Sequence, residues 1–248
     1  MIGVPKIETP EIEKVNPRER MMEQLKQKAE KFYSDKMEYH NFKHALKALE
    51  CARNIMANCE ESKLVFDRDV VEIAALFHDA GYHEELKEGY KNKEEYAAAL
   101  MRQALEKMGG FEEDFIKKVE VVIVGTDPFI DPKEISNFSV EAKIMRAADV
   151  AGMAGDLDDF VEDNIKLKRE HEVLEKGGER ITWKEWKKKT SIIVGKYLDG
   201  DIQLTPHYYD EESEESKFHS TVKYNLENLL TASDESLTQK EEEFFGEK

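Results

Sequence analysis

Apolar residues recur every three or four positions along the first part of the chain. The pattern begins with Met21, Leu25, Ala29 and Phe32, and continues with Ala45, Leu49, Ala52, Ile55 and Met56. Side chains at this spacing lie on one face of a helix. We therefore expect one helix from about residue 20 and a second over residues 41–59.

Capping residues and glycines divide the middle of the chain into further helices. Asp67 and Asp69 offer capping carboxylates to a third helix, which the pattern extends through VVEIAALFHDA to Gly81. Further helices are expected over residues 92–110, 111–125 and 139–155. The valine-rich VEVVIVG has the composition of a strand, but its helical surroundings favour a helix.

The charged segment 156–190 is expected to form two amphipathic helices around Gly177 and Gly178. Trp183 and Trp186, three residues apart, are expected to anchor the second of these helices to the core. SKFHSTVKYNLENLL then predicts a last helix.

The two ends of the chain look less regular than its middle. Residues 1–19 carry three of the six prolines and are expected to form an extended arm, whereas the acidic residues 232–248 are expected to form a frayed tail. The pattern as a whole thus predicts an all-α protein with one domain over residues 20–231.

Composition supports helix over sheet and limits the classes of function. Glycine (13) and proline (6) are scarce among the 248 residues. The net charge of −17 and the lack of a basic face argue against stable binding to long DNA or RNA. Neither a signal peptide nor a transmembrane run is visible, and the two cysteines are expected as free thiols. We therefore expect a cytoplasmic protein without a membrane partner.

Histidines and aspartates from three places in the chain form a candidate metal site. His40 and His44 lie four residues apart at the start of an expected helix and therefore share a face. His78 and Asp79 directly follow an apolar run, and Asp149 follows two alanines on a helix with a mostly apolar face. Polar groups in such places are costly to bury without partners, and a metal ion would satisfy them.

Two imidazoles and two carboxylates offer a mixed set of nitrogen and oxygen ligands. Such a set suits Mn, Fe, Co, Ni or Zn, with Mg as an alternative if a second, water-rich site exists. A bound divalent ion lowers the pKa of a water ligand and stabilises charge on a phosphoryl oxygen. The expected cofactor is therefore a divalent metal ion.

The segments around these residues resemble the HD-domain superfamily of metal-dependent phosphohydrolases. The order His…His-Asp…Asp is the signature of that superfamily, and YHNFKHA resembles the YHN-x-x-HA segment of class I cyclic-nucleotide phosphodiesterases. AALFHDAGY resembles a typical HD-bearing helix, VVIVGTDP and KIMRAADVAGMAGD resemble later stretches of those phosphodiesterases, and DIQLTPHYY resembles part of uncharacterised HD phosphohydrolases. The resemblance covers about residues 39–230 and implies a single HD-domain helical bundle with the metal site in its core.

The resemblance assigns a role to each matching residue. It implies that His44, His78, Asp79 and Asp149 ligate the metal, and that His40 and Asp79 are catalytic, with His40 protonating the leaving group. An imidazole that titrates near neutral pH fits that role. The implied reaction is attack of metal-activated water on a phosphomonoester, a phosphodiester or a nucleotide. The alternative is a catalytically silent HD protein that binds a metal and a nucleotide and regulates a partner.

The chain also departs from the phosphodiesterase pattern. Those enzymes have a further histidine shortly after the HD pair, whereas here His83 comes one position later, and no purine-clamping glutamine is identified. Cyclic-nucleotide specificity therefore does not follow. We expect one tightly held metal ion, with a second one held only through water.

Other residues are candidates for substrate contact. Arg146 lies three residues before Asp149 and is able to bind a phosphate with two hydrogen bonds, the alternative being a structural carboxylate partner. The remaining candidates are Lys43, Lys47, His83, Thr126, Asp127 and either Glu94 or Glu95. Without identifiable partners, His171, His207 and His219 are expected to be surface or structural. The expected partner is a small phosphorylated substrate such as a nucleotide, and a homodimer would be ordinary for such a domain.

Overall fold

The helices before residue 150 pack around two apolar clusters in the computed structural model, which describes residues 16–199, 204 and 216–246. They are α1 (Pro17–Ala29), η1 (Glu30–Phe32), α2 (Phe42–Glu61), α3 (Arg68–Phe77), α4 (Lys93–Met108), α5 (Glu113–Val124), the short α6 (Pro132–Ile135) and α7 (Val140–Asp149). Helix α3 is central, because it is buried from Val70 to Phe77 and contacts α1, α2, α4, α5 and α7. This complete burial explains its nearly unbroken apolar sequence.

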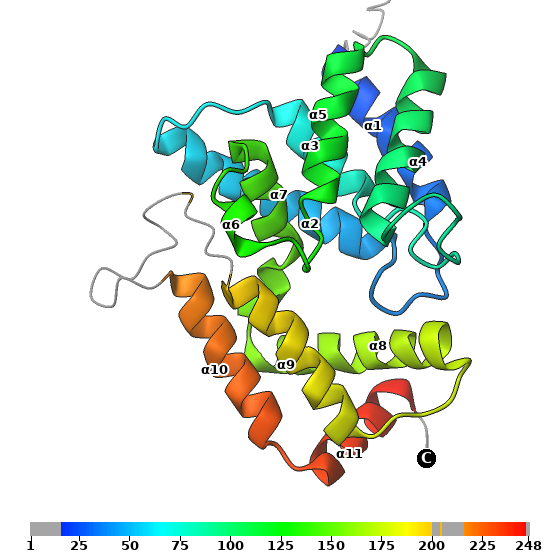
Figure 1. Ribbon diagram of the computed structural model, residues 1–248, viewed down its shortest axis with the longest axis vertical. Coiled ribbons are helices and arrows are strands. Elements are labelled where there is room, and N and C mark those ends of the chain that lie inside the picture. Colours follow the sequence, from blue (N-terminus) through cyan, green and yellow to red (C-terminus); the bar gives the residue numbers. More distant parts are fainter. Residues whose placement is uncertain (1–15, 200–203, 205–215, 247–248) are drawn as a thin grey trace, which may run out of the picture.

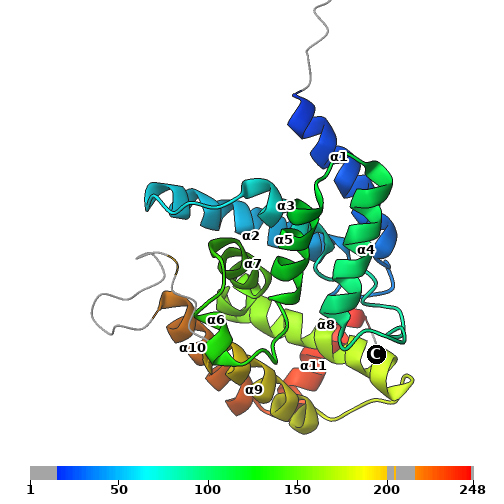
Figure 2. The same cartoon turned by 45° about the horizontal axis from the view of Figure 1, so that its top comes forward.

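The remaining helices form a second layer. After η2 (Ala151–Ala154) come α8 (Leu157–Lys176), α9 (Trp183–Asp199), α10 (Lys217–Thr231) and α11 (Asp234–Phe245). Their own apolar cluster includes both tryptophans, as the sequence predicted, together with Phe160, Leu229 and Leu237. Figures 1 and 2 show α8 on the side of this layer that faces the N-terminal helices. No helix of the described ranges combines the length and the apolar character that crossing a bilayer requires.

The all-α prediction is confirmed, since the described residues contain helices and no strand. The segment VEVVIVG lies within α5, where Val119 and Val122 are buried. The first helix begins three residues earlier than predicted, because Asn16 caps it by accepting a hydrogen bond from the Arg18 amide. Residues 1–15 of the expected arm lie outside the described ranges.

The expectation of a frayed acidic tail is wrong for α11, which a buried network of charges holds in place. Lys168 Nζ on α8 is 2.6 Å from Glu172 Oε1 and 3.1 Å from Glu241 Oε1 on α11. The side chain of each of the three is at most 5% exposed. Arg180 also reaches both carboxylates, at 3.4 and 3.2 Å. The hydrophobic pattern did not predict α11 because only a few apolar side chains of this helix, such as Leu237, join the buried charges in the contact.

A second buried carboxylate, Glu72, connects the first three α-helices. Its side chain is 2% exposed and its oxygens lie 2.8 Å from Arg18 Nη2 on α1 and 2.9 Å from Arg53 Nε on α2. Burial alone would raise the pKa of Glu72, but the two arginines lower it overall. Because the pKa is lower in the folded state, this carboxylate stabilises the fold above the ordinary glutamate pKa, and that stabilisation is lost as the pH falls.

Glu72→Gln is therefore expected to lower the free energy of unfolding at neutral pH by about 2 kcal/mol, because hydrogen bonds to a charged acceptor are lost. The difference from the wild type should shrink as the pH falls through about 4.3, the ordinary pKa of a glutamate. Urea denaturation at a series of pH values measures both effects. Glu60→Gln is the control, since Glu60 pairs with Arg68 but is 54% exposed. Equal losses in the two variants would contradict the prediction.

Candidate metal centre

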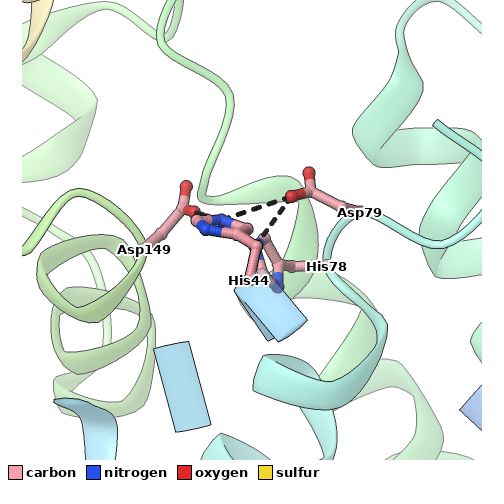
Figure 3. Close-up of side chains that lie close together, drawn as sticks. All are labelled: His44, His78, Asp79 and Asp149. Atoms are coloured by element: carbon pink, nitrogen blue, oxygen red, sulfur yellow. Dashed lines mark hydrogen bonds and ion pairs between the residues drawn. The ribbon is translucent and has the colours of Figure 1, made fainter. Parts of the chain in front are cut away.

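The four side chains predicted to bind a metal lie together where three helices meet. His44 is in the first turn of α2, His78 and Asp79 directly follow α3, and Asp149 is the last residue of α7. One ligand atom from each residue lies within 4.8 Å of the others. Figure 3 shows the two imidazoles between the two carboxylates. These four residues therefore form one group that could hold a metal ion, as the sequence predicted.

Two of the ligand atoms are buried and lack a hydrogen bond. His78 Nδ1 lies 3.0 Å from the carbonyl of Ala75 and donates to it, so that Nε2 is the nitrogen that faces the cluster. That Nε2 and Asp79 Oδ2 form no hydrogen bond within the described part of the chain, although they are only 3.0 Å apart. Burying such atoms unpaired is costly, and a cation between them would remove the cost. The donor set therefore fits a divalent metal ion.

Charges within the cluster shift its pKa values. Burial alone would raise the pKa of Asp149, but His78 and His44 hold it far below the usual range. Asp79 has a lowered pKa for the same reasons, with His78 as the strongest of the opposing charges. Conversely, these two carboxylates raise the pKa of His78 well above its usual value in spite of its burial. Both aspartates are thus kept ionised, which is the state that binds a metal.

A tight turn after α3 positions Asp79 and Tyr82. The helix ends before His78, earlier than predicted, and Gly81 adopts a φ of +73°. A Cβ at Gly81 would lie 2.7 Å from the ring of Tyr96, so that both the backbone conformation and the available space require glycine.

His40 lies beside the cluster but outside it. Its Nδ1 is 2.6 Å from Glu170 Oε2 on α8, and its ring stacks on Tyr82 with centroids 3.8 Å apart. Its ring centroid is 6.0 Å from that of His44. Burial alone would lower the pKa of His40, but the charges of Glu170 and Asp79 raise it overall. Side chains from both layers thus fix this imidazole next to the ligands.

Two pockets open beside the cluster. The first, of about 240 Å³, extends from Asp79 and Asp149 along α8 and α9, and its wall includes Leu167, Leu174, Trp186, Ile193, Val194 and Tyr197. The second, of about 380 Å³, is lined by His44 and Asp149 and includes Lys43, Lys47 and Lys166. His40 and Asp79 line only the first of the two pockets, and His44 lines only the second. Asp149 lines both pockets. The cluster therefore lies between two spaces of different character.

The other candidate residues divide between these pockets and the rest of the protein. Thr126 and Glu94 line the first pocket, although the Thr126 hydroxyl is used in a 2.7 Å hydrogen bond to the carbonyl of Ile123. Burial, with a smaller effect of neighbouring carboxylates, raises the pKa of Glu94 to about 7. The half-buried His83, Glu95 and Asp127 line neither pocket.

Arg146 lines neither of the two pockets. Its side chain is fully buried, and Nη1 donates to the carbonyls of Gly125 at 3.0 Å and Asp127 at 2.7 Å. The guanidinium packs on the ring of Tyr197, 4.7 Å from its centroid. The hydrogen-bond partners of Arg146 are therefore backbone carbonyls of the loop after α5 and not a carboxylate, while Nε and Nη2 are buried without a hydrogen-bond partner among the described residues. The contact with a substrate phosphate stays a prediction.

The α8–α9 wall of the first pocket was missed in the sequence. Glu170 is 4% exposed, and His171, which was expected to be surface or structural, is 7% exposed and lines this pocket. Helical spacing in the sequence could have indicated this wall. Asp163 and Glu170 lie on the same helix face as two leucines, Leu167 and Leu174. Carboxylates on such an apolar face are typical of a functional pocket and not of a solvated helix face. His219 is buried in α10, whereas His207 lies outside the described residues.

No family model matches this chain, and no similar protein is found among the curated proteins. The resemblance to HD-domain proteins therefore stays a prediction from the sequence motifs.

Proposed function

We propose that this protein is a metal-dependent phosphohydrolase whose divalent ion is held by His44, His78, Asp79 and Asp149. The observation that carries the proposal is the pair of buried ligand atoms without hydrogen-bond partners, in a cluster that borders an open pocket. A divalent ion bound there would activate water for attack on phosphorus and stabilise charge on the phosphoryl oxygens. The nitrogen and oxygen donors favour Mn, Fe, Co, Ni or Zn, or Mg with more water ligands.

In this proposal His40 donates a proton to the leaving oxygen. Glu170 accepts the hydrogen bond from Nδ1, so that Nε2 is available to deliver a proton, and the stacked ring of Tyr82 fixes the plane of the imidazole. A well-placed general acid typically accelerates such a step by about 10²–10⁴-fold. Because His40 lines the first pocket, the leaving group of a small phosphorylated substrate is expected there.

The motifs that resemble HD-domain phosphohydrolases support the same function, since their matching residues are the ones that cluster. The alternative is a silent protein that binds a metal and a nucleotide. The pairing of His40 with a buried carboxylate beside the cluster favours the enzyme, because a silent site has no need of an oriented proton donor.

Protein loaded separately with Mn, Co, Ni, Zn or Mg is expected to retain at least one of these ions after desalting and then to hydrolyse generic phosphate mono- or diesters. Elemental analysis and release of the alcohol measure the two properties. Absence of any retained ion under all loading conditions would overturn the proposal. Retained metal and tightly bound nucleotide without hydrolysis of any ester would instead support the silent protein.

A further inference from the structure

The two pockets beside the cluster differ in the charges of their walls. Beyond the ligands, the first pocket presents the carboxylates of Asp163, Glu170 and Glu175, together with Glu94, whose raised pKa leaves it partly protonated at neutral pH. Its one lysine among the described residues is Lys189, whose Nζ lies 3.8 Å from a Glu175 oxygen. The second pocket presents three lysines against the three carboxylates of Asp35, Glu38 and Asp163, so that its charges beyond the ligands balance. An anion therefore finds more positive charge on the second side of the cluster than on the first.

Two of the lysines in the second pocket are available to an anion. Lys43 and Lys47 lie one turn apart on α2, on either side of the ligand His44 in the sequence. Neither forms an ion pair with any carboxylate of the described residues, whereas Lys166 lies 3.2 Å from Asp163. Lys47 Nζ also lies close to Gly152, in the segment after α7. A Cβ at Gly152 would be 3.9 Å from this Nζ.

We infer that the bound substrate spans both pockets. Its leaving group occupies the first pocket, and its phosphoryl group faces Lys43 and Lys47 in the second. Inorganic phosphate is released through the second pocket. This inference rests on the proposed function. In an in-line displacement the attacking and leaving oxygens lie on opposite sides of phosphorus. His40, the proton donor of the leaving oxygen, lines only the first pocket, and the leaving oxygen is therefore placed on that side.

The step balances with the groups that the site provides. The water oxygen forms a bond to phosphorus while the bond from phosphorus to the leaving oxygen breaks with its electron pair. The leaving oxygen takes the proton of His40 and departs as an alcohol. The attacking water releases a proton to the solvent, and His40 is then reprotonated from the solvent. The product anion is then inorganic phosphate, which Lys43 and Lys47 bind through charge-assisted hydrogen bonds.

The wall of the first pocket indicates the class of alcohol. Leu167, Leu174 and Trp186 present aliphatic and aromatic surface, while the carboxylates nearby repel further phosphate groups. The substrate class is therefore a phosphate monoester of an apolar or aromatic alcohol, and a nucleoside triphosphate would be a poor substrate.

The phosphate side is tested with a double variant, Lys43→Met with Lys47→Met, loaded with metal. Its affinity for inorganic phosphate, measured by titration calorimetry, is expected to fall about tenfold, with an equal rise in the product-inhibition constant and unchanged metal content. Lys107→Met is the control, since Lys107 is exposed on α4 and lines neither pocket. Wild-type phosphate affinity in a double variant that retains its metal would overturn the inference.

The leaving-group side is tested with Leu174→Ser. Its kcat/KM for naphthyl phosphate should fall about fivefold while that for methyl phosphate is unchanged, because only the larger alcohol reaches the apolar wall. Leu230→Ser on α10 is a matched control: the two leucines are 40% and 39% exposed, but only Leu174 lines the pocket.

The outcomes separate this inference from the function on which it rests. Absence of turnover of every ester by metal-loaded wild-type protein would overturn the proposed function. Turnover in the wild type, with triphosphates preferred to naphthyl phosphate, would overturn the placement of the leaving group in the first pocket and of the phosphoryl group in the second. The proposed hydrolase function would still stand.

Discussion

Asp149→Ala is expected to remove the metal and, with it, all turnover. Asp149 Oδ1 lies 3.2 Å from His44 Nε2 and 3.1 Å from His78 Nε2, so that this carboxylate joins both imidazole ligands. Loss of a residue that merely supports a ligand typically weakens metal binding about 10–100-fold. Loss of the ligand itself should therefore weaken binding by more than about 100-fold.

Elemental analysis after desalting measures this loss, with ester hydrolysis as the second measurement. Asp163→Asn is a matched control, because Asp163 lines both pockets but does not belong to the ligand cluster. It should keep the wild-type metal content. An Asp149→Ala protein that retains the wild-type amount of metal would show that the cluster is not the metal site.

Thermal unfolding shows whether the variant loses its metal or its fold. Because a ligand of the native state stabilises it, added metal should raise the melting temperature of the wild type. The same metal should leave the Asp149→Ala melting temperature unchanged, while the metal-free proteins unfold in similar, cooperative transitions. A metal-dependent rise of equal size in both proteins would contradict the ligand role.

The parts of this fold that the sequence predicts are those that depend on local pattern. Periodic apolar residues and capping side chains identify α2 and α3, and they outweigh the strand-like composition of α5. The ligands are recognisable for a related reason. His78 and Asp79 stand at the end of an apolar run, where polar groups need an unusual partner.

The parts that it does not predict depend on contacts between distant segments. Glu170 meets His40 across 130 residues, and in the sequence it lies within a charged stretch that looks like a solvated helix face. Arg146 shares the turn of Asp149, yet its guanidinium points to the carbonyls of another loop. Helical spacing says which side chains share a face, but the element that packs against that face decides what those side chains do.

His40→Ala is expected to keep the metal and to lose turnover in a way that depends on the leaving group. For an alkyl phosphate, kcat should fall about 10²–10⁴-fold, because the alkoxide leaves poorly without a proton. For nitrophenyl phosphate the loss should be much smaller, because nitrophenolate is a stable anion and leaves unprotonated. Parallel assays of both esters measure the difference. His83→Ala is the control, since this half-buried histidine lines neither pocket.

A companion variant, Glu170→Gln, separates donation of the proton from simple packing of the imidazole. Glu170 accepts hydrogen bonds from the backbone amides of Tyr39 and His40 as well as from His40 Nδ1. Glutamine keeps the size and one accepting oxygen but removes the charge that holds a proton on His40. Its loss of activity should therefore be smaller than that of His40→Ala and should again be larger for the alkyl ester. Equal losses for both esters in both variants would mean that His40 positions the substrate and does not protonate the leaving group.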